Sequence, residues 1–129
     1  MKYIIDTHIF IWATTEPKQL SINARKILEE NTGNVYLSSA SIWELAIKSN
    51  IGKLEFTNIS KFVKDGCKAL NCKILPIQSS HLFKVESLYK HEKHKDPFDR
   101  LIIAQSIVTK YTVVTVDAYF KDYNIKLVT

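Results

Sequence analysis

Apolar residues in this chain follow two alternating patterns: short continuous runs, and longer stretches in which they recur every three or four positions. Short runs bounded by polar residues predict buried β-strands, whereas the longer spacing predicts amphipathic helices. The predicted strands cover residues 2–6, 35–37, 73–77, 111–116 and 126–128. Because Pro76 has no backbone N–H to donate, the third strand is expected to end there or to lie at a sheet edge.

Six helices are predicted between these strands, and most of them begin at a side chain that can accept a hydrogen bond from a helix N-terminus. Ser41-Ile-Trp-Glu44 has the S-x-x-E spacing of a capping box. Asp96-Pro97 is a strong start signal, because proline is favoured at the first helical position and Asp99 falls in the first turn. The remaining helices are expected after Asp6 and from Ser21, Ser60 and Ser80, with Gly66 an unusual residue inside one of them.

Strands that alternate with helices are typical of βαβ units, which place a parallel sheet between two layers of helices. The predicted fold class is therefore α/β, a three-layer arrangement with about five parallel strands. A chain of 129 residues fits one domain, residues 1–129. In such sheets ligands bind beyond the carboxyl ends of the strands, near the point where the strand order reverses.

Composition and charge narrow the function further. Hydrophobic residues make up 46% and charged residues 24% of the chain, as in folded globular proteins. The 18 Lys and Arg exceed the 13 Asp and Glu by five, which favours a polyanionic partner such as nucleic acid. No apolar stretch is long enough for a signal peptide or a membrane span, and Cys67 and Cys72 form no CxxC motif, so we expect a reducing, cytoplasmic location and no membrane partner.

Four acidic residues lie at predicted element ends: Asp6 and Asp117 close strands, whereas Glu44 and Asp99 fall in first turns of helices. Each has an ordinary structural explanation as a turn residue, a capping-box partner or a residue that complements the helix dipole. A parallel sheet, however, brings strand carboxyl ends and helix N-termini to one edge. Two carboxylates about 5 Å apart repel by about 3 kcal/mol, more than the ~1 kcal/mol that one cap contributes. A divalent cation would cancel this repulsion, and oxygen ligands select Mg²⁺ or Mn²⁺.

The same residues resemble the PIN-domain nucleases, and among them the VapC-like toxins of bacterial toxin–antitoxin pairs. The resemblance covers essentially the whole chain. Its motifs are Tyr3-Ile-Ile-Asp-Thr-His8 with Trp12, Ser39-Ala-Ser-Ile-Trp-Glu-Leu-Ala-Ile-Lys48, Gly52-Lys-Leu54, Asp96-Pro-Phe-Asp-Arg-Leu-Ile-Ile-Ala-Gln105 and Val114-Thr-Val-Asp117. The resemblance implies a PIN-like fold and an endoribonuclease that binds one or two Mg²⁺ or Mn²⁺ ions, cleaves RNA, has a cognate antitoxin and forms a homodimer.

Carried over by position, the resemblance assigns the family's acidic quartet, which holds the metal and is catalytic, to Asp6, Glu44, Asp99 and Asp117. Asp96 is the alternative to Asp99 and is otherwise the cap of its helix. Nearby basic and imidazole side chains are candidates for RNA contact, although surface lysines are usually only solvated and Arg100 could instead pair with an acid. These candidates are His8, Lys48, Lys53, Arg100 and the segment 90–95, which is expected to be a solvated loop.

Other enzyme classes find little support in this sequence. His91-Glu-Lys-His94 is one residue short of the H-E-x-x-H zinc motif, and the chain contains no G-x-S-x-G, P-loop or dinucleotide fingerprint. Trp12 and Trp43 lie on apolar helix faces and are expected in the core or at a dimer interface. Two other functions stay open: a PIN nuclease for housekeeping RNA processing or for DNA, and a catalytically silent RNA-binding regulatory module.

Overall fold

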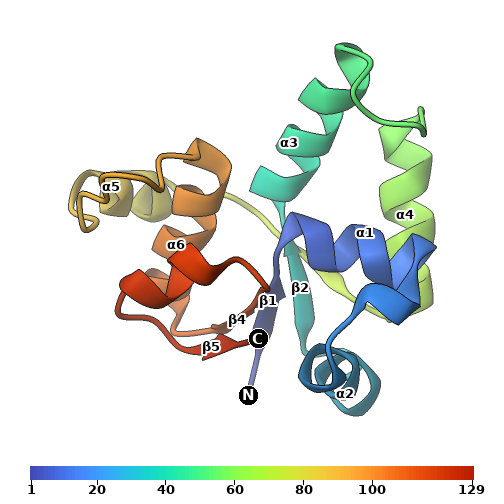
Figure 1. The fold of residues 1–129 in the computed structure, drawn as a ribbon, viewed down its shortest axis with the longest axis horizontal. Helices are drawn as coiled ribbons and strands as arrows, with labels where there is room; N and C mark the ends of the chain where they lie inside the picture. Colours follow the sequence, from blue (N-terminus) through green and yellow to red (C-terminus); the bar gives the residue numbers. More distant parts are fainter.

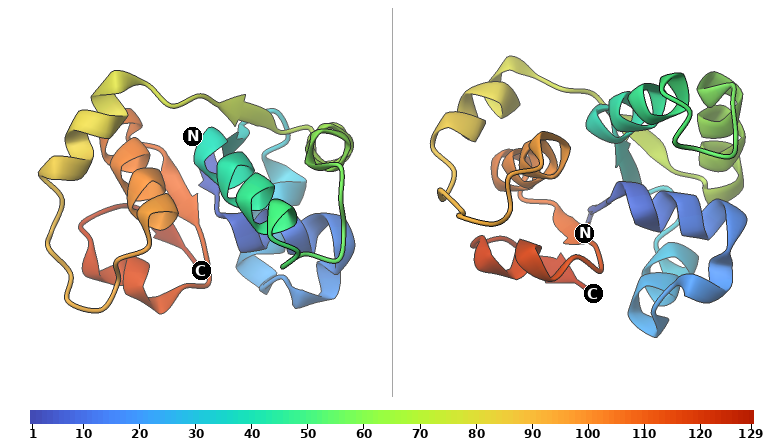
Figure 2. Two further views of the ribbon diagram at one scale, coloured as in Figure 1. Left: turned by 90° about the horizontal axis from the view of Figure 1, so that it is seen from above. Right: turned by 45° about the horizontal axis from the view of Figure 1, so that its top comes forward.

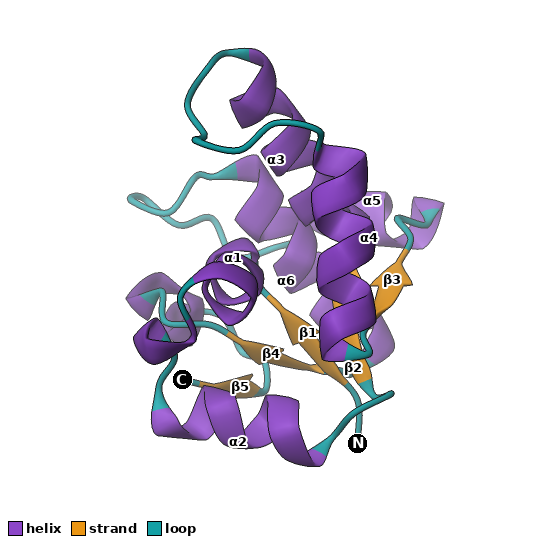
Figure 3. Ribbon diagram, turned by 90° about the vertical axis from the view of Figure 1, so that its right-hand side faces the viewer, coloured by secondary structure: helices purple, strands orange, loops and turns teal.

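Three consecutive apolar residues form β1 (Tyr3–Ile5) at the centre of a five-stranded parallel sheet in the computed structural model, which describes residues 1–129 (Figure 1). The strand order is β3-β2-β1-β4-β5, so the chain fills one side of β1 before it crosses to the other (Figure 3). The other strands are β2 (Val35–Ser38), β3 (Lys73–Leu75), β4 (Thr112–Val114) and β5 (Leu127–Val128). The predicted α/β class and parallel sheet are confirmed, and β3 ends before Pro76 at the sheet edge.

The helices alternate with these strands along the chain and cover both faces of the sheet (Figure 1). None of them is both long enough and apolar enough to cross a membrane. The α-helices and 3₁₀ turns are α1 (Thr7–Thr15), η1 (Pro17–Gln19), α2 (Ile22–Glu30), α3 (Ser39–Asn50), α4 (Ile59–Leu70), α5 (Ser79–Glu86), α6 (Pro97–Thr109) and η2 (Ala118–Asp122).

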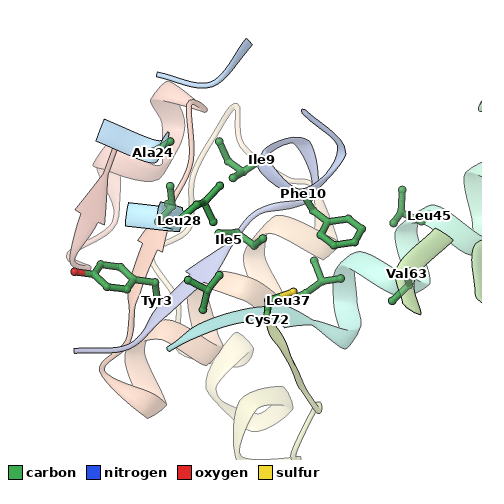
Figure 4. Close-up of a cluster of buried hydrophobic side chains, with 12 residues drawn as sticks. Tyr3, Ile5, Ile9, Phe10, Ala24, Leu28, Leu37, Leu45, Val63 and Cys72 are labelled. Carbon is green, nitrogen blue, oxygen red and sulfur yellow. The ribbon is translucent and has the colours of Figure 1, made fainter. Parts of the chain in front are cut away.

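Alternate side chains of β1 enter two separate cores, because successive residues of a strand point to opposite faces. Tyr3 and Ile5 join a cluster with residues of α1, α2, α3 and α4, which Figure 4 shows in close-up. Ile4 joins the second cluster, which α6 dominates and to which Leu88, just beyond α5, contributes. The α6 residues of this second core are Leu101, Ile102, Ile103 and Ala104.

Three predicted helix starts were wrong by one to three residues. Helix α3 follows β2 without a linker, so Ser38 ends the strand and also caps the helix, accepting a hydrogen bond from the Ala40 N–H. Ser41 and Glu44 are therefore inside the helix, and they form no capping box. Helix α4 starts before Ser60 because Asn58 takes the left-handed conformation and accepts from the N–H of Lys61. Helix α5 begins at Ser79, one residue before the predicted start.

Helix α3 lies between α1 and α6 and packs against both (Figure 2). Helix α1 in turn packs against α4, where Gly66 faces Phe10 and Thr14. A Cβ atom on Gly66 would lie 2.5 Å from the Phe10 ring and 2.9 Å from the Thr14 methyl group. The glycine inside the predicted helix is therefore required by the close approach of α4 to α1, the helix that begins at Asp6.

We predict that Gly66→Ala lowers the free energy of unfolding by about 1–2 kcal/mol. Alanine gains up to ~1 kcal/mol of helix propensity, but crowding in a packed core costs about 1–3 kcal/mol. Urea unfolding followed by circular dichroism measures the change. Lys64→Ala, at an exposed position of the same helix, is the matched control and should change stability by less than ~0.5 kcal/mol. A Gly66→Ala protein at least as stable as wild type would contradict the packing argument.

Candidate functional site

The strand order reverses between β1 and β4, and a cavity of about 400 Å³ opens beyond the carboxyl ends of these two strands. Asp6 follows β1 directly, and Asp117 lies three residues beyond β4. The four predicted acids and Asp96 all line this one cavity. Its lining residues are Asp6, Thr7, His8, Trp12, Glu44, Lys48, Asp96, Asp99, Val116 and Asp117.

Asp6 is the most deeply buried of these acids, with 4% of its surface exposed. One carboxylate oxygen accepts a hydrogen bond from the Ile9 N–H (2.8 Å) and thereby caps α1. The other accepts from the hydroxyl of Thr115, which follows β4. Burial raises the pKa of Asp6 above its usual range, and the charge of Asp117 adds to the increase. Asp6 is therefore rigidly held at a position where a negative charge is costly.

Asp99 lies in the first turn of α6, and its carboxylate faces the imidazole of His94. The distance from His94 Nε2 to Asp99 Oδ2 is 3.1 Å, and to Asp117 Oδ2 it is 3.8 Å. Burial raises the pKa of Asp99 to about 6. The hydrogen bond with His94 acts in the opposite direction, and the charges of Asp96 and Asp6 add smaller increases to the pKa. Like-charged neighbours and partial burial thus act on Asp99 in the same direction.

Glu44 enters the cavity from the second turn of α3, and its carboxylate is buried. Thr7 Oγ1 donates to one oxygen at 2.7 Å, and Lys48 Nζ lies 2.6 Å from the other. Thr7 Oγ1 is also 2.9 Å from the hydroxyl of Ser41, so α1 and α3 are joined at this point. Lys48 is the one Lys or Arg side chain among the lining residues.

Three of the aspartates, Asp6, Asp96 and Asp117, also cap helices. The cap predicted at Asp96 is confirmed, whereas the structural explanation considered for Asp6 and Asp117 was that of turn residues. Asp96 Oδ1 accepts from the Asp99 N–H (3.0 Å), and Asp117 Oδ1 accepts from the Tyr119 N–H (2.9 Å). In both cases one oxygen makes the cap while the residue still lines the cavity. Asp96, predicted as a cap, therefore also adds a fifth carboxylate to the site.

The predicted RNA-contact residues divide into two groups. His8 and Lys48 line the cavity, and the His8 ring lies 5.9 Å from the ring of Trp12. Arg100 does not line it and pairs with no acid. Its guanidinium donates to the Tyr89 carbonyl oxygen (3.1 Å) and to the Tyr123 hydroxyl (2.8 Å). Arg100 therefore ties the segment before α6 to the C-terminal part of the chain.

The expectation of a fully solvated loop at residues 90–95 was wrong for its two histidines. His94 is 4% exposed, and the His91 side chain is 9% exposed. His91 Nε2 lies 2.7 Å from Asp122, and both histidine rings pack against Tyr119 and Tyr123. The buried position of His94 was not predictable from the sequence, because its partners are 5 to 29 residues away in the chain. Two histidines just before Asp96-Pro97 were the only local sign.

The donor set of the cavity fits a hard divalent cation. Five carboxylates face one space, and a single lysine balances them. Burial, with a smaller contribution from neighbouring carboxylates, raises the pKa of Asp6 and Asp99, so the negative charges are poorly compensated by the protein itself. Oxygen donors of this kind suit Mg²⁺ or Mn²⁺, and His94, Asp99 and Asp117 place possible ligand atoms within 4.8 Å of one another.

A three-layer parallel α/β domain with an acidic cavity at its switch point is the class that this geometry defines. Comparison with protein families identifies it: residues 3–126 match the model of the PIN domain, and the chain belongs to this family. A search of curated proteins found no match.

Solved structures with the same fold cover nearly the whole chain. VapBC2 from Rickettsia felis, bound to a promoter DNA fragment, shares 19% identity at a TM-score of 0.76 and covers 99% of this chain and 98% of its own. A toxin–antitoxin complex from Klebsiella pneumoniae shares 18% identity at a TM-score of 0.67, with coverages of 99% and 97%. FitAcB from Neisseria gonorrhoeae shares 21% identity at a TM-score of 0.62, with coverages of 98% and 96%. At these identities the similarity shows the fold.

We predict that the metal-free protein loses stability as pH rises through about 6, and that Asp99→Asn removes part of this loss. The folded-state pKa of Asp99 is raised from 3.8 to about 6, so its contribution is fully present below about pH 3.8 and is lost as the carboxyl ionises in the folded protein. After discounting for partial exposure, Asp99→Asn should gain about 1–2 kcal/mol relative to wild type between pH 4.5 and 7.5.

Urea unfolding in EDTA at several pH values measures this difference. Glu30→Gln, at an exposed position, is the control for the loss of one surface charge. A stability difference between Asp99→Asn and wild type that does not change from pH 4.5 to 7.5 would contradict the raised pKa.

Proposed function

We propose that this protein is a Mg²⁺- or Mn²⁺-dependent endoribonuclease and the toxin of a toxin–antitoxin pair. The observation that carries the proposal is the gathering of Asp6, Glu44, Asp99 and Asp117 in one cavity at the strand ends. PIN domains are a family of nucleases, which supports hydrolysis of a phosphodiester bond. Residues 1–129 form the proposed nuclease domain, and the proposed site of action is the cytoplasm.

The roles proposed for the acids follow from their surroundings. Asp6, Asp99 and Asp117 lie beside one another at the switch point and would hold the metal, directly or through water. Glu44 would complete the site or position the attacking water, with Lys48 and Thr7 fixing its two oxygens. A bound Mg²⁺ or Mn²⁺ lowers the pKa of coordinated water and stabilises charge on the leaving oxygen.

The excess of basic over acidic residues supports RNA as the substrate. If the four acids are set apart as a metal centre, 18 basic residues remain against 9 acidic ones. A cation-filled acidic cavity within a basic surface attracts a polyanion and places its backbone at the reactive centre. Lys48 and His8 line the cavity and are the residues that we propose for contact with the phosphate or the neighbouring nucleotide.

The toxin role and the partners rest on the structural neighbours. The structure from Klebsiella pneumoniae is described as a toxin–antitoxin complex, and its fold spans this whole chain. We therefore propose a cognate antitoxin protein as partner. A homodimer is also proposed, and three half-exposed apolar residues spaced four apart on or just beyond α3 support a protein-binding surface there: Trp43, Ile47 and Ile51.

We predict that Asp6→Asn and Asp99→Asn lower the rate of RNA cleavage in Mg²⁺ by about 100-fold or more, because even residues that only orient metal ligands affect activity by about 10–100-fold. Purified variants and end-labelled RNA provide the measurement. Asp65→Asn changes an exposed acid on α4 that does not line the cavity, and this variant should cleave at the wild-type rate. EDTA should stop cleavage by wild type, and added Mg²⁺ or Mn²⁺ should restore it. Wild-type cleavage rates from folded Asp6→Asn and Asp99→Asn proteins would contradict the assignment of these two residues to the metal site.

The toxin role is tested by induced expression in a bacterial host. Wild type should arrest growth and produce new RNA 5′ ends that map to defined cut sites, and Asp6→Asn should do neither. Sequencing of RNA ends from both strains identifies the substrate. Equal toxicity of the two proteins would defeat the catalytic explanation, and cleavage without growth arrest would favour a housekeeping nuclease.

A further inference from the structure

His94 is the buried side chain that the proposed metal site leaves unexplained. It comes from the loop before α6, and its ring touches groups from three parts of the chain. Nε2 lies 3.1 Å from Asp99 Oδ2, and Nδ1 lies 3.0 Å from the Tyr123 hydroxyl. His94 is thus either a ligand of the cation or the group that holds a ligand.

The partners of Nε2 decide between these roles. A carboxyl group that binds a metal ion is ionised, and an ionised Asp99 carboxylate can only accept hydrogen bonds. A bare Nε2 is also only an acceptor, so two lone pairs would face each other at 3.1 Å. With Asp99 ionised, the 3.1 Å contact requires Nε2–H to donate a hydrogen bond to Asp99 Oδ2, and a protonated nitrogen has no lone pair for a metal.

The opposite side of the imidazole is anchored as well. Arg100 is a donor only, and its Nη1 donates to the Tyr123 hydroxyl at 2.8 Å. The Tyr123 hydroxyl in turn contacts His94 Nδ1, and the Tyr123 side chain is almost fully buried. A continuous series of contacts runs from Arg100 through Tyr123 and His94 to Asp99.

We infer that His94 is a positioning residue, which holds Oδ2 of Asp99 through Nε2–H so that Oδ1 is the oxygen presented to the cation. The inference rests on the proposed function, because it concerns the same metal site. It also explains why Arg100, His91 and His94 contact the C-terminal segment: these contacts fix the orientation of Asp99. His94 stabilises the ligand and does not itself bind the metal.

Two substitutions at His94 separate the nitrogen atoms of the ring. The side-chain amide nitrogen of glutamine reaches the position of Nε2, whereas that of asparagine reaches only the position of Nδ1. His94→Gln can still donate to Asp99, and His94→Asn cannot. We therefore expect His94→Asn to weaken Mg²⁺ and Mn²⁺ binding by about 10–100-fold, and His94→Gln to recover most of this loss. Tyr123→Phe keeps the ring but removes the hydroxyl, and we expect a loss of about 10-fold.

Calorimetric titration of the full chain with Mg²⁺ and with Mn²⁺ measures these affinities, and thermal unfolding without metal checks that each variant is folded. Glu92→Gln, exposed in the same loop, is the control and should bind both ions as wild type does. Nitrogen NMR of His94 gives a second readout: Nε2 should remain protonated when Mg²⁺ is added.

Each outcome bears on the inference. Equal metal affinity of His94→Asn and wild type, or no recovery in His94→Gln, would overturn it. Loss of the Nε2 proton on Mg²⁺ addition, with His94→Gln losing Mn²⁺ affinity more than Mg²⁺ affinity, would make His94 a direct ligand instead. If wild type binds neither ion, the proposed function itself fails. If Asp99→Asn abolishes binding while His94→Asn does not change it, only the inference fails.

Discussion

Repulsion between carboxylates is the constraint on which the arrangement of this protein depends. Five acids face one cavity of about 400 Å³, and one lysine lies among them. At an effective dielectric constant near 20, two such charges 5 Å apart repel by about 3 kcal/mol. A fold that gathers them must hold each side chain against this force. Strand ends, helix N-termini and the buried side chain of His94 all contribute to holding these acids in place.

Helix capping is the means by which the backbone holds three of these acids. Asp6, Asp96 and Asp117 each use one oxygen to accept from a backbone N–H at the start of a helix. The positive end of a helix dipole also favours a negative charge there. Capping and metal binding are therefore compatible uses of the same carboxylate, because a carboxylate has two oxygens and several lone pairs. Each of these aspartates can thus cap a helix with one oxygen and still offer a lone pair of the other oxygen to a metal ion.

Contacts between distant segments supply the remaining order. Thr115 after β4 donates to Asp6 after β1, and Thr7 on α1 donates to Glu44 on α3. The first hydrogen bond joins the ends of β1 and β4 at the switch point, and the second joins α1 to α3 beside it. Two further contacts connect distant segments: α4 packs closely against α1 at Gly66, and the ring of His94 packs against that of Tyr123. The site is thus the place where the layers of the fold are joined.

The sequence by itself determined the α/β class, the five parallel strands and the gathering of Asp6, Glu44, Asp99 and Asp117 at one edge. The period of hydrophobic residues and the alternation of strands with helices can be read locally, and in a parallel sheet all strands have their carboxyl ends at the same edge. Only the tertiary structure decided that Ser38 caps α3, that Arg100 contacts Tyr123 and does not line the cavity, and that His94 is buried beside Asp99. The positions of Arg100 and His94 depend on a partner far away in the chain, Tyr123, and no local pattern encodes which distant side chains will meet. The Ser38 cap is a local contact, but β2 extends as far as Ser38 through its pairing with β3.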